Sequence, residues 1–152
     1  MRLHRFPHPD HHPGAQPAVV AAVAIGGAAG ASARHWAELL GPTVAPAFPW
    51  TILAVNLVGC FLMGILMVTV KRRFPGTHRL ISPLLGTGVL GGFTSFSHYT
   101  DNVRVLFEYG RPGAAVGCLL LTAAAAPAAV AVGALATHLA LGPGDRAPGG
   151  AR

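Results

Sequence analysis

Residues able to do chemistry gather in one short part of an otherwise apolar segment, GGFTSFSHY, Gly91–Tyr99. Adjacent glycines weaken a helix, and the hydroxyls of Thr94, Ser95 and Ser97 can satisfy backbone groups that a broken helix sets free. Broken helices at membrane depth are tolerated where they are buried in protein or line a cavity. Because their freed carbonyls and half-helix ends can face ions, the stretch favours ion coordination, with a packing kink as the alternative.

Two kinds of neutral group in the chain suit an anion. Phe96 and Tyr99 are three residues apart, on one helical face, and aromatic ring edges carry partial positive charge. Asn56 lies near the middle of another apolar run, and its amide offers two donors and an acceptor. An intramembrane polar residue indicates function by default, although a hydrogen bond between helices also explains Asn56.

The charged side chains lie nearer the ends of the apolar runs. Arg34 is toward the end of the first run, as a topology anchor or as an attractor of anions. A guanidinium at the bilayer centre costs about 2.5–3.5 kcal/mol on insertion scales, whereas one near a helix end reaches the interface. Glu38 and Asp101 fall at ends, so no carboxylate lies mid-span. Neutral donors suit a small anion that sheds water, and the missing acid argues against proton coupling.

Positioning these groups is the task of four predicted membrane spans. The chain has 152 residues, of which 52% are apolar and only 11% are charged, which favours an all-α integral membrane protein. A spanning helix needs about 20 mostly apolar residues, and four runs qualify. They are residues 17–40, 48–70, 80–107 and 113–141, with the third broken near its middle. Residues 1–16 and 142–152 are predicted to be flexible tails.

The remaining metal and cysteine signals are weak. The N-terminal tail carries His4, His8, His11 and His12, which could bind a metal or simply belong to a disordered, proline-punctuated segment. Cys60 and Cys118 lie in apolar runs without a CxxC partner, which is typical of small packing residues. No catalytic constellation or phosphate loop occurs, so we expect no enzyme.

Small residues and charge predict how the spans pack and insert. Gly26/Gly30 and Gly88/Gly92 have the GxxxG spacing that lets helix backbones approach closely. The net charge of +6 comes from scattered residues without interleaved aromatics, so nucleic-acid binding is not expected. One side of the membrane would hold Arg2, Arg5, Lys71, Arg72, Arg73, Arg79, Arg146 and Arg152, and the other Arg34, Arg104 and Arg111. This excess favours cytoplasmic termini.

Three motifs, in order, resemble the Fluc or CrcB family of small four-helix fluoride channels. They are GGAAGASARH (Gly26–His35), WTILAVNLVGCFLMG (Trp50–Gly64) and GVLGGFTSFSHY (Gly88–Tyr99). They are similar to the family's glycine-rich first helix ending in arginine, its VNxxGxFxxG pattern and its GxxGGxTTFSTF signature. The fourth span matches only in character.

The resemblance implies a plasma-membrane channel that lets fluoride leave the cytoplasm passively, built as an antiparallel, dual-topology dimer with two pores. It also implies a structural sodium ion at the dimer centre, held by backbone carbonyls of Gly91 and Thr94. The implied pore residues, with Ser97 added from the signature stretch, are Arg34, Asn56, Phe96, Ser97, Tyr99 and Thr122.

Departures from the family pattern keep alternatives open. Tyr99 replaces a phenylalanine, Asn102 stands where an acid often follows, and Thr122 is the only hydroxyl of the fourth span before Thr137. Together with the charge bias, these features suggest pairing with an oppositely oriented paralogue in place of a homodimer. The other readings are a less active subunit of such a heterodimer and a small proton-coupled multidrug exporter.

Overall fold

The computed structural model describes residues 15–73 and 80–142, and all regular elements within those ranges are helices. In chain order they are α1 (Ala15–Leu40), α2 (Trp50–Arg73), the π-helix η1 (Ser82–Leu90), α3 (Gly91–Phe93), α4 (Phe96–Glu108) and α5 (Pro112–Ala140). The histidine-rich N-terminal tail, most of the second loop and nearly all of the C-terminal tail lie outside the described residues, as do the charges predicted there.

Local signals explain where the helices begin and end. The α1 helix stops before Gly41-Pro42, and α2 starts directly after Pro49. The basic side chains of Lys71, Arg72 and Arg73 occupy the last turn of α2, where they complement the helix dipole. Pro112 stands at the start of α5, where its missing N–H costs nothing.

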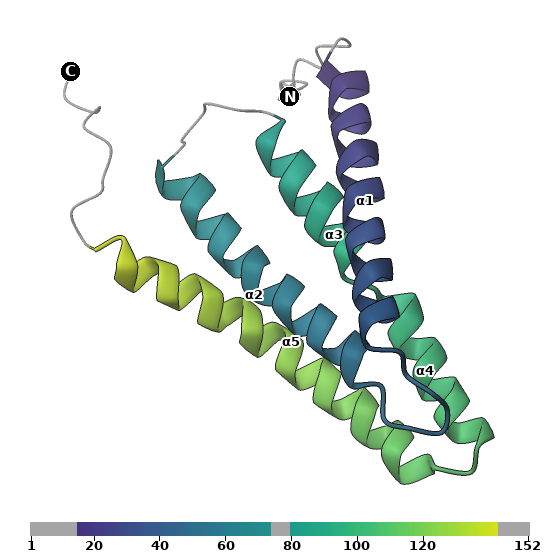
Figure 1. Ribbon diagram of the computed structural model, residues 1–152. Helices are drawn as coiled ribbons and strands as arrows, with labels where there is room; N and C mark the ends of the chain where they lie inside the picture. Colours follow the sequence, from purple (N-terminus) through teal and green to yellow (C-terminus); the bar gives the residue numbers. More distant parts are fainter. Residues whose placement is uncertain (1–14, 74–79, 143–152) are drawn as a thin grey trace, which may run out of the picture.

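The helices form two closely packed pairs. One pair is α2 with α5, and the other is α1 with η1 and α3. Figure 1 shows the pairs diverging toward the N-terminal end of α1 and converging where α4 crosses below. The α4 helix packs against α5, around a buried cluster of Tyr99, Val103, Leu106, Ala115 and Cys118. The interruption of the helix between α3 and α4 therefore lies where the two pairs meet.

Glycine contacts bring the members of each pair together. A methyl group at Gly30 would collide with the carbonyl of Val89, and one at Gly64 would collide with the carbonyl of Val130. Gly26 and Gly92 face equally close backbone across the α1 interface. The close packing predicted from the GxxxG spacing is thus confirmed, since any side chain there would push the helices apart.

Three helices are long and apolar enough to cross a membrane within the described ranges. They are Gln16–Leu40, Trp50–Arg73 and Pro112–Ala140. Their bounds lie within a few residues of the first, second and fourth predicted spans. Large apolar side chains remain exposed on α1, α2 and α5, with Leu40 87% and Leu139 73% accessible, as expected for lipid-facing or partner-facing surfaces.

The third predicted span is divided into shorter pieces. Its first part is the π-helix η1, in which the amide of Gly91 donates to the carbonyls of Gly86 and Gly88. After α3 the backbone becomes extended at Thr94 (ψ 150°) and Ser95 (ψ 114°), and Ser95 then caps α4 by accepting from the amide of His98. No piece alone has the length of a membrane span. π-helical turns are rare and frequently mark functional sites.

Candidate functional site

Asn56 of α2 holds the extended chain between α3 and α4. Its Oδ1 accepts from the amide of Ser95 at 2.8 Å, and its Nδ2 donates to the carbonyl of the same residue at 3.3 Å. The side chain is only 7% exposed. The amide thus replaces the helical hydrogen bonds that the interruption removes, and its second N–H hydrogen stays available to another acceptor.

Gly59, one turn after Asn56, makes room for this arrangement. A methyl group at Gly59 would collide with the methyl of Thr94 and lie 3.2 Å from the ring of Phe93. The two residues of the Asn-x-x-Gly spacing therefore have different roles. The asparagine binds the backbone of Ser95, and the glycine leaves room for the side chains of Phe93 and Thr94. The spacing lies within the Trp50–Gly64 motif, but no role was predicted for Gly59.

A cavity of about 350 Å³ opens beside this junction. Its walls come from α2, the extended residues, α4 and α5, and they include Asn56, Cys60, Thr94, Ser95, Phe96, Tyr99, Thr122, Ala123, Ala126 and Pro127. The lining is mostly apolar, with a few convergent polar groups. That combination is typical of a binding site.

Thr122 contributes a buried hydroxyl to the cavity wall. Several helical hydroxyls in the described chain donate to the carbonyl four residues earlier, as those of Ser32, Thr69, Thr100 and Thr137 do. The Oγ1 of Thr122 has no nitrogen or oxygen partner among the described residues, although the residue is only 7% exposed. The thiol of Cys118, a weak hydrogen-bonding partner, interacts with this side chain. An unpaired buried hydroxyl beside a cavity is suited to a ligand or water.

Pro127 modifies the same wall. Because proline has no amide hydrogen, the carbonyl of Ala123 loses the partner that a regular helix would supply. Both residues line the cavity. The wall that α5 contributes is therefore more polar than its alanine-rich sequence indicates.

The aromatic rings of Phe96 and Tyr99 lie together on one face of α4, as their spacing predicted. The ring centroids of Phe96 and Tyr99 are 5.6 Å apart with planes inclined at 58°. Tyr99 is 5% exposed and donates its hydroxyl to the carbonyl of Leu119 at 2.9 Å, which ties α4 to α5. Phe96 lines the same cavity but is 78% exposed, so most of its surface is uncovered in the single chain.

Arg34 belongs to a separate polar cluster across the break. Its Nη1 donates to Oε1 of Glu38 at 3.2 Å and lies 3.2 Å from Nε2 of His98. Its Nε is buried without a partner in the described chain. The contact with His98 connects the Arg34 side chain to α4, so its position depends on more than its own helix.

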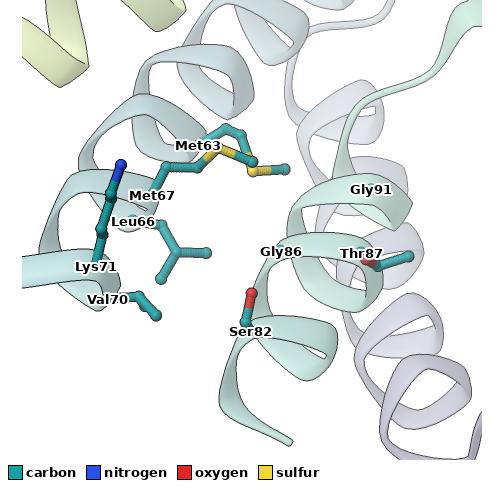
Figure 2. A pocket seen from close by; sticks show the side chains of 9 residues that line it. All are labelled: Met63, Leu66, Met67, Val70, Lys71, Ser82, Gly86, Thr87 and Gly91. Atoms are coloured by element: carbon teal, nitrogen blue, oxygen red, sulfur yellow. The ribbon is translucent and has the colours of Figure 1, made fainter. Parts of the chain in front are cut away.

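Gly91 lies on another cavity, of about 400 Å³, between α2 and η1. Figure 2 shows the side chains of Met63 and Met67 of α2 extending toward the opposite wall, on which Gly86 and Gly91 lie. Because the amide of Ser95 donates to Asn56, it does not serve the carbonyl of Gly91, its acceptor in a continuing helix. The helical hydrogen bond to this carbonyl is thus lost through the Asn56 contact.

The predicted site residues thus lie in three places: two cavities and the polar cluster around Arg34. Asn56, Thr94, Phe96, Tyr99 and Thr122 surround one cavity. Gly91 lines the second cavity, and Arg34 and Ser97 lie in the polar cluster. No role was predicted for Gly59, His98 or Pro127. The glycine and the histidine lie inside the quoted motifs, and a proline within an apolar span is a signal visible in the sequence.

Comparison with known proteins identifies a family that matches most of the chain. The family described as "CrcB-like protein, Camphor Resistance (CrcB)" matches residues 21–134, which include every residue of the junction and both cavities. A Streptomyces coelicolor protein named Fluoride-specific ion channel FluC 1 is 48% identical over 126 residues, covering 83% of this chain and 81% of its own. A Nocardia farcinica protein named Fluoride-specific ion channel FluC 2 is 41% identical over 138 residues, covering 91% of this chain and 98% of its own.

Proposed function

The chain belongs to the CrcB-like family, and we propose that it is a multi-pass cell-membrane channel that lets fluoride leave the cytoplasm passively. The relatives carry this proposal, since the Streptomyces and Nocardia proteins are named fluoride-specific ion channels and align over most of their lengths. The predicted membrane character agrees with the three helices able to span a bilayer. A channel needs no catalytic group.

The cavity beside the Asn56–Ser95 junction is the part of the chain best suited to the anion. It offers the remaining N–H of Asn56, the unpaired hydroxyl of Thr122 and the rings of Phe96 and Tyr99. These groups are neutral, so they can replace water around a small anion without trapping it as a fixed charge would. Selectivity would then rest on a narrow path and matched donors.

Passive export needs no energy-coupling residue. Hydrogen fluoride is a weak acid that enters a cell neutral and dissociates inside. The inside-negative potential drives the trapped anion out with about 2.3 kcal/mol per charge per 100 mV. The cavity lining includes no carboxylate among the described residues, so a proton-coupled drug exporter has no acid there to titrate.

We infer further that two copies assemble around the break, as an antiparallel dimer. Phe96 borders the cavity yet is 78% exposed in one chain, which suggests that a second chain closes the path. Carbonyl oxygens at broken membrane helices suit sodium. The amides that a continuing helix would direct at the carbonyls of Gly91 and Thr94, those of Ser95 and His98, donate instead to Asn56 and to Ser95 Oγ. Two carbonyls per chain coordinate a cation incompletely, so a site at the dimer axis would draw on both copies. The ion would fix the two breaks against each other.

Reconstitution tests the proposal. The purified chain, alone in liposomes loaded with potassium fluoride, should release fluoride rapidly once valinomycin relieves the charge imbalance. Vesicles loaded with potassium chloride should release little chloride. Equal rates for the two anions would exclude fluoride selectivity. Fluoride release only when a second, related chain is added would favour a heterodimer over a homodimer.

A further inference from the structure

A chain of hydrogen bonds joins α1 to the start of α4 outside the cavity. It runs from Arg34 through the ring of His98 to the hydroxyls of Ser95 and Ser97. The His98 ring lies 3.2 Å (Nε2) from Arg34 Nη1 and 3.0 Å (Nδ1) from Ser95 Oγ. The two serine hydroxyls are 3.2 Å apart.

The donor inventory limits the direction of this chain. The Nη1 of Arg34 lies 3.2 Å from Nε2 and 3.3 Å from Nδ1 of His98, and a guanidinium can only donate, so one of the two ring nitrogens accepts. With Nε2 accepting, a neutral ring carries its hydrogen on Nδ1 and donates it to Ser95 Oγ. Ser95 can then donate to Ser97, whose own hydroxyl hydrogen is left to point outward. Hydrogen bonds aligned in this way strengthen one another.

The histidine ring is the main cross-helix support of Arg34. Glu38, the other partner of the guanidinium, is on the same helix, and the Nε of Arg34 has no partner in the described chain. Without the ring, the guanidinium would be held only by a carboxylate one turn away and would be free to follow it. The ring also contacts Ser95, the residue held by Asn56 on the opposite side.

We propose that His98 is a positioning residue, which fixes the charge of Arg34 beside the helix break and orients the hydroxyls of Ser95 and Ser97. The inference rests on the proposed fluoride pathway and adds to it a determinant of how readily the anion enters. A fixed positive charge next to the remaining hydroxyl donor of Ser97 raises the local concentration of anions. The effect therefore falls on entry and not on passage through the cavity.

Two substitutions separate positioning from folding. His98→Gln keeps a side-chain acceptor for Arg34 and a donor for Ser95, whereas His98→Phe keeps the ring shape and removes both. Fluoride release from liposomes is measured against internal fluoride concentration for each variant. For His98→Phe we expect the half-saturating concentration to rise about three- to tenfold, with the maximal rate nearly unchanged, and His98→Gln to stay close to the wild type.

The outcomes are distinguishable. If the wild type releases fluoride selectively and His98→Phe leaves the half-saturating concentration unchanged, the positioning role is wrong and the channel function stands. A fall in maximal rate alone, or an equal loss in His98→Gln, would also overturn it, because a structural defect acts in that way. Absence of fluoride release by the wild-type chain would overturn the function and this inference together. Elution as a single species in detergent checks that each variant folds.

Discussion

Asn56 and Ser95, 39 residues apart in the chain, share two hydrogen bonds that close the gap between α3 and α4. An asparagine side chain matches a backbone peptide group, since it carries a donor and an acceptor side by side. Asn56 therefore takes the place of the backbone partners that Ser95 would have in a continuous helix. Its position in the cavity wall follows from this anchoring, so structure and proposed conduction depend on the same side chain.

Replacing Asn56 with aspartate should abolish conduction. The carboxylate keeps the acceptor for the amide of Ser95 but loses the donor to its carbonyl, and it places a negative charge on the cavity wall. We expect fluoride release to fall more than tenfold, because a like charge repels the anion and the break loosens. Asn102→Asp is the matched control, since Asn102 is the chain's other asparagine and lies outside the cavity. Comparable losses in both variants would contradict a specific role for Asn56.

Gly59→Ala should destabilise the same junction by crowding. The added methyl group meets the side chain of Thr94 and the ring of Phe93, so α2 and the extended residues must separate. We expect a loss of about 1–3 kcal/mol of stability and a reduced fluoride flux. The control is Gly117→Ala in α5, where a methyl group meets nothing within 4 Å. That change should raise stability by about 0.5–1 kcal/mol, since alanine favours the helix.

Thermal unfolding in detergent compares the two glycine variants directly. The prediction requires opposite signs for the same chemical substitution. A shift in the same direction for both would show that the close approach at Gly59 does not constrain the junction.

Tyr99→Phe tests whether the hydroxyl that departs from the family pattern belongs to the ion path. In the structure it donates to the carbonyl of Leu119 and so connects α4 to α5. We expect a loss of about 1 kcal/mol in stability, with fluoride release preserved, because the ring and its contact with Phe96 remain. Unfolding and efflux are measured on the same preparation. A large drop in efflux at unchanged stability would place the hydroxyl in the pathway instead.

The sequence predicted the features that depend on local spacing. Gly26 and Gly30 recur at helical period, so their shared contact face could be foreseen, and the three-residue spacing of Phe96 and Tyr99 placed the rings together. Asn56 was recognisable because a polar group inside an apolar run costs energy. Each of these signals is contained within a single helix.

Features set by contacts between distant segments were not predictable. The sequence located the helix weakness at Gly91-Gly92, but both residues are helical and the extended backbone begins at Thr94. The shift arises because Asn56, on another helix, captures the amide of Ser95. The π-helical turns of η1 and the contact of His98 with Arg34 likewise depend on which helices pack together, which periodicity does not encode.

Thr122 offers a test in which stability and conduction should move in opposite directions. Its hydroxyl is buried without a nitrogen or oxygen partner in the described chain, which is unfavourable for the folded state. Thr122→Val keeps the shape and removes that hydroxyl, so we expect stability to rise by about 1 kcal/mol. If the hydroxyl donates to the anion in the cavity, fluoride release should fall about tenfold, while Thr122→Ser retains most of it.

Thr69→Val is the matched control for this test, because the hydroxyl of Thr69 donates to the carbonyl of Ile65 and lies outside the Asn56 cavity. Its removal should lower stability slightly, at most about 1 kcal/mol, and leave fluoride release unchanged. Unfolding curves and efflux rates for the three variants decide the matter. A Thr122→Val chain that is more stable and conducts normally would show that the unpaired hydroxyl serves no ion, and the path would then have to follow Asn56 and the aromatic rings alone.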